Sequence, residues 1–139
     1  MKIKDVMTPD VDTLDPDASL QEAAEMMSAS GLSTLPITER GRVVGLLSES
    51  DIVSRVVAAG LDPRETKVDE VMSEDFLMCR EDCGLERAER LMTEAGETRI
   101  LVLDDEGVLA GIATMSDIAS ELSDGYELEL PDARALAYN

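Results

Sequence analysis

Hydrophobic and polar positions follow the same order twice along this chain of 139 residues. In each half, apolar residues recur at spacings of three and four, which predicts an amphipathic helix. The first such helix opens with "SLQE" at Ser19–Glu22, a capping box, and Gly31 follows its end. The apolar faces are Leu20, Ala23, Ala24 and Met27 in the first half and Leu85, Ala88, Leu91 and Met92 in the second.

Two short apolar runs follow each predicted helix. They are "TLPI" and "RVVGLLS" in the first half, and "RILVL" and "VLAGIAT" in the second. Polar turns containing glycine separate them, which predicts a β-hairpin with strands covered on both faces. Extended pieces at Val11–Leu14 and Phe76–Cys79 precede the helices, and further helices are expected at 49–59 and 115–122. The order is β-α-β-β-α, twice, in a mixed α/β (α+β) fold.

The chain contains an internal duplication. "DVMTPD" at residues 5–10 returns as "EVMSED" at 70–75, an offset of 65, and "GLLSESDI" at 45–52 returns as "GIATMSDI" at 111–118, an offset of 66. Such matching spans indicate two copies of one structural unit. We predict a first repeat at 1–60, a linker at 61–69, a second repeat at 70–124 and a C-terminal tail at 125–139. The tail has no counterpart, and the sequence leaves open whether it docks as a strand.

Charge narrows the range of partners. The formal net charge is -19, with 31 acidic and 12 basic residues. Such a surface repels phosphate backbones and anionic membranes, so nucleic acid is not an expected partner. The acidic, lysine-poor balance suits a salt-rich cytoplasm, where counterions screen self-repulsion. No apolar run reaches the ~18 residues that span a bilayer, and the N-terminus is unlike a signal peptide, so we expect a cytoplasmic protein.

Catalytic chemistry has little support. The chain has no histidine, which removes the commonest catalytic base. Cys79 and Cys83 lack zinc-ligand spacing and are expected to be structural thiols. Carboxylates for magnesium are abundant, but the glycine-lysine loop of a nucleotide hydrolase is missing. We therefore expect no enzyme, no catalytic residue and no metal site.

The repeated motifs resemble a known family. The paired "VMT" and "VMS" entries, "LPI" before the first hairpin and a G-h-x-[S/T]-x-x-D motif in both copies are similar to a tandem pair of CBS domains, a Bateman module, over roughly 3–122. The resemblance implies two pseudo-symmetric repeats packed through their sheets. It also implies a regulatory module that binds adenosine-type ligands in clefts between the repeats and requires no cofactor. Pairing of two chains, hence a homodimer, is a further expectation from the family.

The motif's polar residues are the first candidate site. In that family the Asp hydrogen-bonds ribose hydroxyls and the Ser or Thr faces ribose or phosphate. Here these positions are Ser48 and Asp51 in one copy, and Thr114 and Asp117 in the other. A carboxylate can accept hydrogen bonds from both hydroxyls of a cis-diol. The same spacing is also that of a helix cap with an acidic first turn, and the two roles can coexist.

The resemblance also implies that the two clefts differ. One cleft would combine Thr8, Val11, Leu32, Arg99, Ile112, Thr114 and Asp117, and the other Leu46, Ser48, Asp51, Ser73, Phe76 and Glu97. Arg99 would supply a cation for phosphate, whereas the corresponding residue of the first copy is the neutral Thr34. We therefore predict that the cleft of Asp117 is the better nucleotide site.

Two functions from different classes follow. The first is a ligand-sensing module that binds AMP, ADP, ATP or S-adenosylmethionine and acts in trans on an effector protein that the sequence does not identify. The second is a structural dimerisation or interaction module whose clefts are degenerate, as Glu97 and the scarcity of basic residues favour. Saturable nucleotide binding would discriminate between them.

Overall fold

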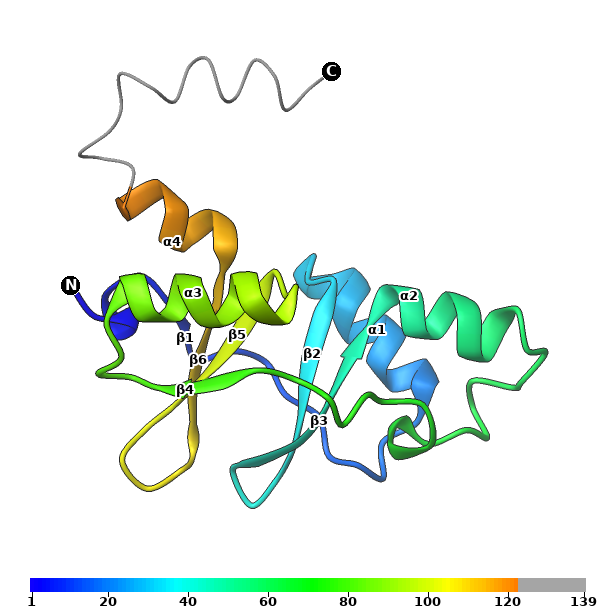
Figure 1. The fold of residues 1–139 in the computed structure, drawn as a ribbon. Coiled ribbons are helices and arrows are strands. Elements are labelled where there is room, and N and C mark those ends of the chain that lie inside the picture. The colour runs from blue at the N-terminus through cyan, green and yellow to red at the C-terminus, as the bar shows by residue number, and fades with distance from the viewer. Residues whose placement is uncertain (123–139) are drawn as a thin grey trace, which may run out of the picture. The chain divides into compact units, whose positions relative to one another are not determined.

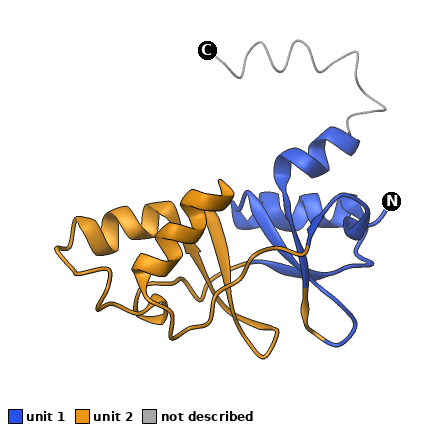
Figure 2. Cartoon of the chain, turned by 180° about the vertical axis from the view of Figure 1, so that it is seen from behind, with its two compact units in different colours: residues 1–9, 77–106, 110–139 blue, residues 10–76, 107–109 orange. Residues whose placement is uncertain are grey.

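The computed structural model describes residues 1–122, so the predicted tail at 125–139 lies outside the described residues. The chain forms two compact units (Figure 2). The segment that opens each repeat, residues 1–9 and residues 70–76, is called its entry segment, and each entry segment belongs to the unit of the other repeat. Unit 1 contains residues 1–9, 77–106 and 110 onward, and unit 2 contains residues 10–76 and 107–109. The first nine residues therefore fold with the second half of the chain, a pairing that the order of the sequence repeats does not indicate.

Unit 1 contains a mixed four-stranded sheet with two helices (Figure 1). A 3-10 turn at Ile3–Asp5 leads into this unit, whose elements are β1 (Thr8–Pro9), β4 (Met78–Arg80), α3 (Leu85–Ala95), β5 (Arg99–Leu103), β6 (Leu109–Thr114) and α4 (Met115–Leu122). The strand order is β1-β6-β5-β4. Strand β1 is antiparallel to β6, with Thr8 opposite Ile112, and β4 is parallel to β5.

Unit 2 repeats this topology in reduced form. Its elements are α1 (Leu20–Ser30), β2 (Thr34–Glu39), β3 (Arg42–Ser48), α2 (Glu49–Ile52), a π-helical turn (Val53–Val57) and a 3-10 turn (Val68–Glu70). Strands β2 and β3 form an antiparallel hairpin. An antiparallel bridge between Leu46 and Ser73, and a parallel bridge between Leu14 and Ile37, take the places of β1 and β4. The prediction of a mixed α/β fold with two repeats is confirmed.

The predicted helix ends of α1 are confirmed. The Glu22 N–H donates to the Ser19 hydroxyl at 3.1 Å, and the Ser19 N–H donates to the Glu22 carboxylate at 3.1 Å. Gly31 ends the helix at a φ of 74°, a left-handed conformation that costs glycine little. Helix α3 begins after Gly84, which has no side chain to supply a cap. The two helices thus share their length but not their N-terminal stabilisation.

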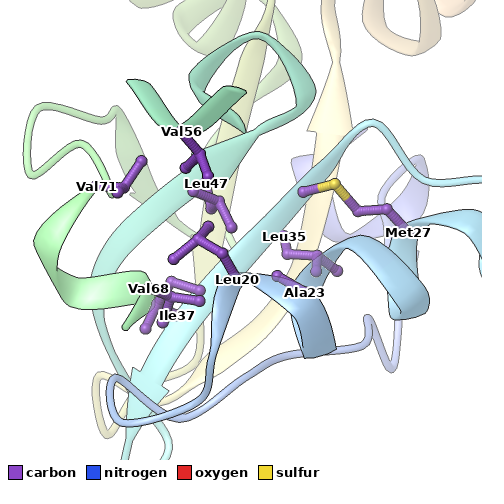
Figure 3. Packing of buried hydrophobic residues seen from close by; sticks show 9 residues of the cluster. All are labelled: Leu20, Ala23, Met27, Leu35, Ile37, Leu47, Val56, Val68 and Val71. Carbon is purple, nitrogen blue, oxygen red and sulfur yellow. The ribbon is translucent and has the colours of Figure 1, made fainter. Parts of the chain in front are cut away.

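Each unit has its own apolar core. In unit 2, three of the four residues of the predicted face of α1 (Leu20, Ala23 and Met27) pack against the sheet, as Figure 3 shows, in a cluster that also contains Leu35, Ile37, Leu47, Val56, Val68 and Val71. The fourth, Ala24, is half-buried outside this cluster. In unit 1 the core is Ile3, Leu85, Ala88, Met92, Ile100, Val102, Ala113 and Ile118. A fully buried Leu or Ile stabilises a fold by about 1.5–3 kcal/mol. Ile3 and Val71 show that both entry segments contribute to the cores.

Two predicted elements are wrong in detail. The extended piece at Val11–Leu14 is not a strand, because within it only Leu14 pairs, through its bridge to Ile37. The helix predicted at 49–59 is α-helical only to Ile52 and continues as a π-helical turn, in which the Ala58 N–H donates to the Val53 carbonyl at 2.8 Å. The Ser54 hydroxyl donates to the Ser50 carbonyl at 2.7 Å. Such side-chain bonds compete with the α-helical ladder, which accounts for the change of register.

The second strand of each hairpin also differs from the prediction. Strands β2 and β5 are buried at consecutive positions, as predicted. Strands β3 and β6 are buried only at alternate residues, Gly45 and Leu47 in β3, and Gly111 and Ala113 in β6. The positions between them, Leu46 and Ile112, are half-buried. These two candidate site residues therefore point to the less covered face of their sheets.

Candidate functional site

The first candidate site lies in unit 2, where β3 leads into α2. Ser48 ends the strand and caps the helix. The Ser48 N–H donates to Oδ2 of Asp51 at 2.9 Å, and the Asp51 N–H donates to the Ser48 hydroxyl at 3.1 Å. Both residues are half-buried. This reciprocal bonding holds the carboxylate at the start of the helix.

The second candidate site repeats this geometry in unit 1, where β6 leads into α4. The Thr114 N–H donates to Oδ2 of Asp117 at 3.3 Å, and the Asp117 N–H donates to the Thr114 hydroxyl at 3.1 Å. The structural role of the motif as a helix cap is therefore present in both copies. Within residues 1–122, the second oxygen of each Asp accepts no hydrogen bond. Each carboxylate keeps acceptor capacity beyond its cap.

The entry segments bring a hydroxyl residue to each site. Thr8 on β1 lies opposite Ile112, two residues before Thr114. Ser73 exchanges two backbone hydrogen bonds of 2.9 Å with Leu46, two residues before Ser48. Thr8 is exposed and Ser73 is half-buried. Thr8 and Ser73 are equivalent residues of the two repeats, 65 positions apart in sequence, and each takes the equivalent place beside the site of its unit.

The motif glycines receive the methionines of the entry segments. A Cβ at Gly111 would lie 2.6 Å from both Met7 Sδ and the Thr8 carbonyl oxygen. A Cβ at Gly45 would likewise overlap the side chain of Met72, with its Cγ at 2.7 Å. Sequence reasoning did not connect these methionines with the glycines. The sequence contains a pattern that could have indicated this contact, because both "VM[ST]" and the glycine motif occur once in each repeat.

Arg99 distinguishes the two sites. It begins β5, and the preceding Thr98 carbonyl accepts the N–H of Met115, the first residue of α4, at 2.9 Å. The backbone of Arg99 therefore lies beside the helix start that carries Asp117. In unit 2 the equivalent residue is Thr34, which lies opposite Ser48 and is 7% exposed. At this position, the unit of Asp117 has the cation Arg99, whereas the unit of Asp51 has the buried hydroxyl of Thr34.

The remaining predicted wall residues divide between the units. Val11, Leu32 and Phe76 belong to unit 2, the unit of Asp51, and all three are half-buried. Glu97 belongs to unit 1, the unit of Asp117. The structure places Phe76 in the same unit as its predicted site partners. It does not bring Val11 and Leu32 into the unit of Asp117, so their part in that site stays a prediction.

Burial makes Cys79 a poor nucleophile. Cys79 and Cys83 are both free thiols and half-buried. Burial, aided by the neighbouring Cys83, raises the pKa of the Cys79 thiol to about 12. Because the thiolate is the nucleophile and the metal ligand, Cys79 is inert near neutral pH. Across residues 1–122, no three His, Cys, Asp or Glu side chains are grouped as metal ligands. No helix in that part of the chain is long and apolar enough to cross a membrane.

Comparisons with known proteins agree with this fold. The family model "CBS domain" matches residues 3–58 and 68–124. A CBS domain-containing protein of Bacillus subtilis, YhcV, is 36% identical over 117 residues, which cover 84% of this chain and 82% of that protein. The crystal structure of CBSX2 in complex with AMP is similar with a TM-score of 0.74 and 25% identity, covering 88% of this chain and 96% of the other.

Some relatives are much longer enzymes. The inosine-5'-monophosphate dehydrogenase of Methanocaldococcus jannaschii is 31% identical over 118 residues, which cover 84% of this chain but 23% of that enzyme. The similarity therefore concerns a part of the enzyme about the size of this chain. It gives no reason to assign the dehydrogenase reaction to the residues described above.

Proposed function

This chain belongs to the CBS-domain family, and from that premise we propose that it is a regulatory module that binds an adenosine-type ligand and acts on a partner protein in trans. The observation that carries the proposal is the repeated helix start. There, a capping box fixes an Asp that keeps one oxygen without a donor among residues 1–122. The entry segment brings a second hydroxyl residue to the strand that precedes the helix, Thr8 to β6 and Ser73 to β3.

Ribose chemistry suits this arrangement. The two hydroxyls of a ribose form a cis-diol, and one carboxylate can accept a hydrogen bond from each. A charged acceptor makes such bonds stronger than a neutral one, by roughly a factor of two. The capping box fixes the carboxylate before the ligand arrives, so little side-chain entropy is lost on binding. Asp51 and Asp117 are therefore proposed as the ribose-binding residues.

Phosphate chemistry favours the site of Asp117. An anionic ligand must approach a chain of net charge -19, which requires local positive charge. Arg99 begins the strand next to that site, and a guanidinium can bind phosphate through two parallel hydrogen bonds. Thr34 cannot offer a charge at the equivalent position. We propose that Asp117, Thr114, Ile112, Thr8 and Arg99 form the better nucleotide site.

Similarity to a protein crystallised with AMP supports the ligand class. CBSX2 matches nearly the whole described chain, and its complex contains AMP. The nucleotide itself is left open among AMP, ADP, ATP and S-adenosylmethionine, because the reach of Arg99 toward one, two or three phosphates decides between them.

The regulatory step would act through the entry segment. Strand β1 has two residues, so few hydrogen bonds hold it on β6. A ligand that contacts Thr8 and Asp117 together would stabilise that pairing in unit 1. Binding can shift a conformational equilibrium only by its difference in affinity for the two states. The proposed output is therefore a ligand-dependent position of residues 1–9, read by a partner or by a second copy of the chain.

Calorimetric titration tests the proposal. Wild-type protein would be titrated with AMP, ADP, ATP and S-adenosylmethionine at low and high KCl, beside an Asp51→Ala/Asp117→Ala double variant. Glu22→Ala is the matched control, since it removes a capping-box carboxylate that has no proposed ligand. The proposal predicts saturable binding of at least one ligand by wild type and Glu22→Ala, and none by the double variant. Binding that survives the double substitution would contradict it.

The caps themselves favour a second function. Because each Asp already serves a capping box, the motif would be retained in a purely structural interaction module with degenerate clefts. That alternative predicts no heat from any of the four ligands, together with self-association in sedimentation equilibrium that no ligand alters. Ligand-dependent association would favour the regulatory module instead.

A further inference from the structure

We propose that Arg55 is a positioning residue for the site of Asp51. It holds entry segment 70–76 on β3 and so keeps Ser73 beside that site. The described part of unit 1 contains no equivalent bond, so segment 1–9 is the entry segment that leaves its hairpin more readily. The inference rests on the proposed function for the role of the two sites, but the bond of Arg55 does not involve a ligand.

Arg55 reaches the entry segment through its guanidinium. Nη1 donates to the Val71 carbonyl at 2.9 Å, across 16 positions of sequence. No other group within residues 1–122 donates to that carbonyl, and Val71 is 2% exposed. A buried carbonyl without a donor costs free energy, and a charged donor forms a stronger bond than a neutral one. Loss of the guanidinium should therefore weaken the hold on the entry segment.

Val71 lies two residues before Ser73 in the same segment. Between them, Met72 packs its side chain over the glycine of β3. Ser73 and Leu46 then exchange two backbone hydrogen bonds of 2.9 Å, which form an isolated bridge and not a longer ladder. Because a segment with few hydrogen bonds opens easily, the bond from Arg55 adds an attachment where it is needed most.

The π-helical turn that carries Arg55 is itself held by the core. Val56, the next residue, is fully buried, and it belongs with Val71 to the apolar cluster of unit 2 (Figure 3). The turn continues α2, whose first turn carries Asp51. A bond from this turn to the entry segment therefore fixes Ser73 relative to Asp51.

Unit 1 lacks this attachment. The residue equivalent to Arg55, at an offset of 66, is Glu121, and the residue equivalent to Val71, at an offset of 65, is Val6. An ionised carboxylate has no proton to donate to a carbonyl. No side chain in the described part of unit 1 donates to the Val6 carbonyl. The two repeats thus hold their entry segments differently, although the backbone turns that precede them are alike.

The two entry segments provide a matched pair of amide probes. The Met72 N–H donates to the Val68 carbonyl at 2.9 Å, and the Met7 N–H donates to the Ile3 carbonyl at 3.0 Å. Valine precedes both methionines, so the intrinsic exchange rates of the two amides are similar. In protein without ligand, NMR-detected hydrogen exchange should be at least tenfold slower at Met72 than at Met7. Failure of the proposed nucleotide binding would leave this result unaffected.

Variants of Arg55 test the bond itself. Arg55→Met keeps most of the aliphatic stem and removes every donor, so exchange at Met72 and Ser73 should become at least tenfold faster. Arg55→Lys keeps a charged donor and should exchange at least threefold more slowly than Arg55→Met at the same two amides. Arg64→Ala removes an exposed arginine from unit 2 and is the charge-matched control, which should change neither rate.

An amide on the other edge of the hairpin separates positioning from a general loss of stability. The Thr38 N–H donates to the Leu14 carbonyl at 2.9 Å, on the β2 side. Arg55→Met should change its exchange less than threefold, because the entry segment lies on the β3 side. Equal acceleration at Thr38 and Ser73 would make Arg55 a general stabiliser and overturn the proposal. Unchanged exchange at Met72 in Arg55→Met, or equal wild-type rates at the two methionine amides, would also overturn it.

Discussion

The side chain of Met72 lies over the α-carbon of Gly45, in the place where a larger residue at position 45 would begin its own side chain. Met7 and Gly111 stand in the same relation in unit 1. Neither glycine has a positive φ, so close approach, not backbone freedom, accounts for both. This contact fixes each entry segment on a hairpin and so places Ser73 and Thr8 beside the candidate sites.

Replacement of Gly45 by alanine should destabilise the protein by about 1–3 kcal/mol, because the new methyl group overlaps the side chain of Met72. A methionine side chain is flexible, and Met72→Ala in the same chain should recover at least half of the loss. Urea unfolding of the single and double variants measures both effects. Equal stability of wild type and Gly45→Ala would contradict the contact.

Replacement of Gly111 by alanine should be harder to relieve. The new methyl group would meet the Thr8 carbonyl oxygen at 2.6 Å as well as the sulfur of Met7. Because a backbone atom cannot rotate away, Met7→Ala should recover little of the lost stability. Gly84→Ala is the control, since nothing lies within 4 Å of that Cβ position. Full rescue by Met7→Ala would show that β1 is displaced from β6 more easily than the register implies.

The sequence alone predicted most of the local structure. The helical spacing from Leu20 to Met27 and the cap at Ser19 are local features, and local patterns determine them. The exchange of entry segments could not be derived in that way, because hydrophobic pattern tells which face of a segment is buried but not which sheet buries it. Only the family resemblance linked Thr8 with Asp117 and Ser73 with Asp51.

Other differences have equally specific causes. Leu14 makes a single bridge where a strand was predicted, and the residues just before it do not pair with β2. The π-helical turn after Ile52 depends on how individual hydrogen bonds compete, which spacing does not reveal. The capping role of Asp51 and Asp117 was foreseen, whereas their role toward a ligand stays a prediction.

Arg99→Ala should weaken binding of AMP about 5- to 100-fold and leave binding of adenosine nearly unchanged, because the guanidinium is proposed to contact phosphate only. Calorimetry with both ligands gives the comparison. Arg64→Ala, which removes an exposed arginine from unit 2, is the matched control and should change neither affinity. An equal loss for adenosine and AMP would show that Arg99 acts on the fold of the site.

The thiol of Cys79 should react slowly. Burial raises its pKa to about 12, so at pH 8 the thiolate is a very small fraction. In a Cys83→Ser variant, iodoacetamide should modify Cys79 at least about 100-fold more slowly in the folded protein than in urea, as mass spectrometry would measure. Similar rates in both states would mean that the thiol is not buried in solution.

The same shift has a consequence for stability. Because folding raises the pKa of Cys79, its contribution to the free energy of unfolding is complete below pH 9. That contribution is lost as the pH rises toward about 12. Comparison of wild type with Cys79→Ser in urea between pH 8 and 11 isolates this contribution. The free energy of unfolding of wild type, measured relative to that of Cys79→Ser, should fall as the pH rises. A shift in the opposite direction would contradict the raised pKa.

Salt should stabilise the fold. A net charge of -19 on 139 residues produces self-repulsion that counterions screen. The thermal midpoint should rise between 0.1 and 2 M KCl. Removing exposed charge by Asp12→Asn/Glu94→Gln should raise the midpoint at low salt and have little effect at high salt. A midpoint that falls with KCl would indicate that attractive ion pairs outweigh the repulsion.

The most direct test of the central claim compares the two aspartates one at a time. AMP and ATP would be titrated calorimetrically into Asp51→Ala and Asp117→Ala, with Glu22→Ala as the control for loss of a capping box. We predict that Asp117→Ala loses affinity at least tenfold, whereas Asp51→Ala and the control bind like wild type. Wild-type affinity in Asp117→Ala, with loss in Asp51→Ala, would contradict the assignment of the nucleotide site to unit 1.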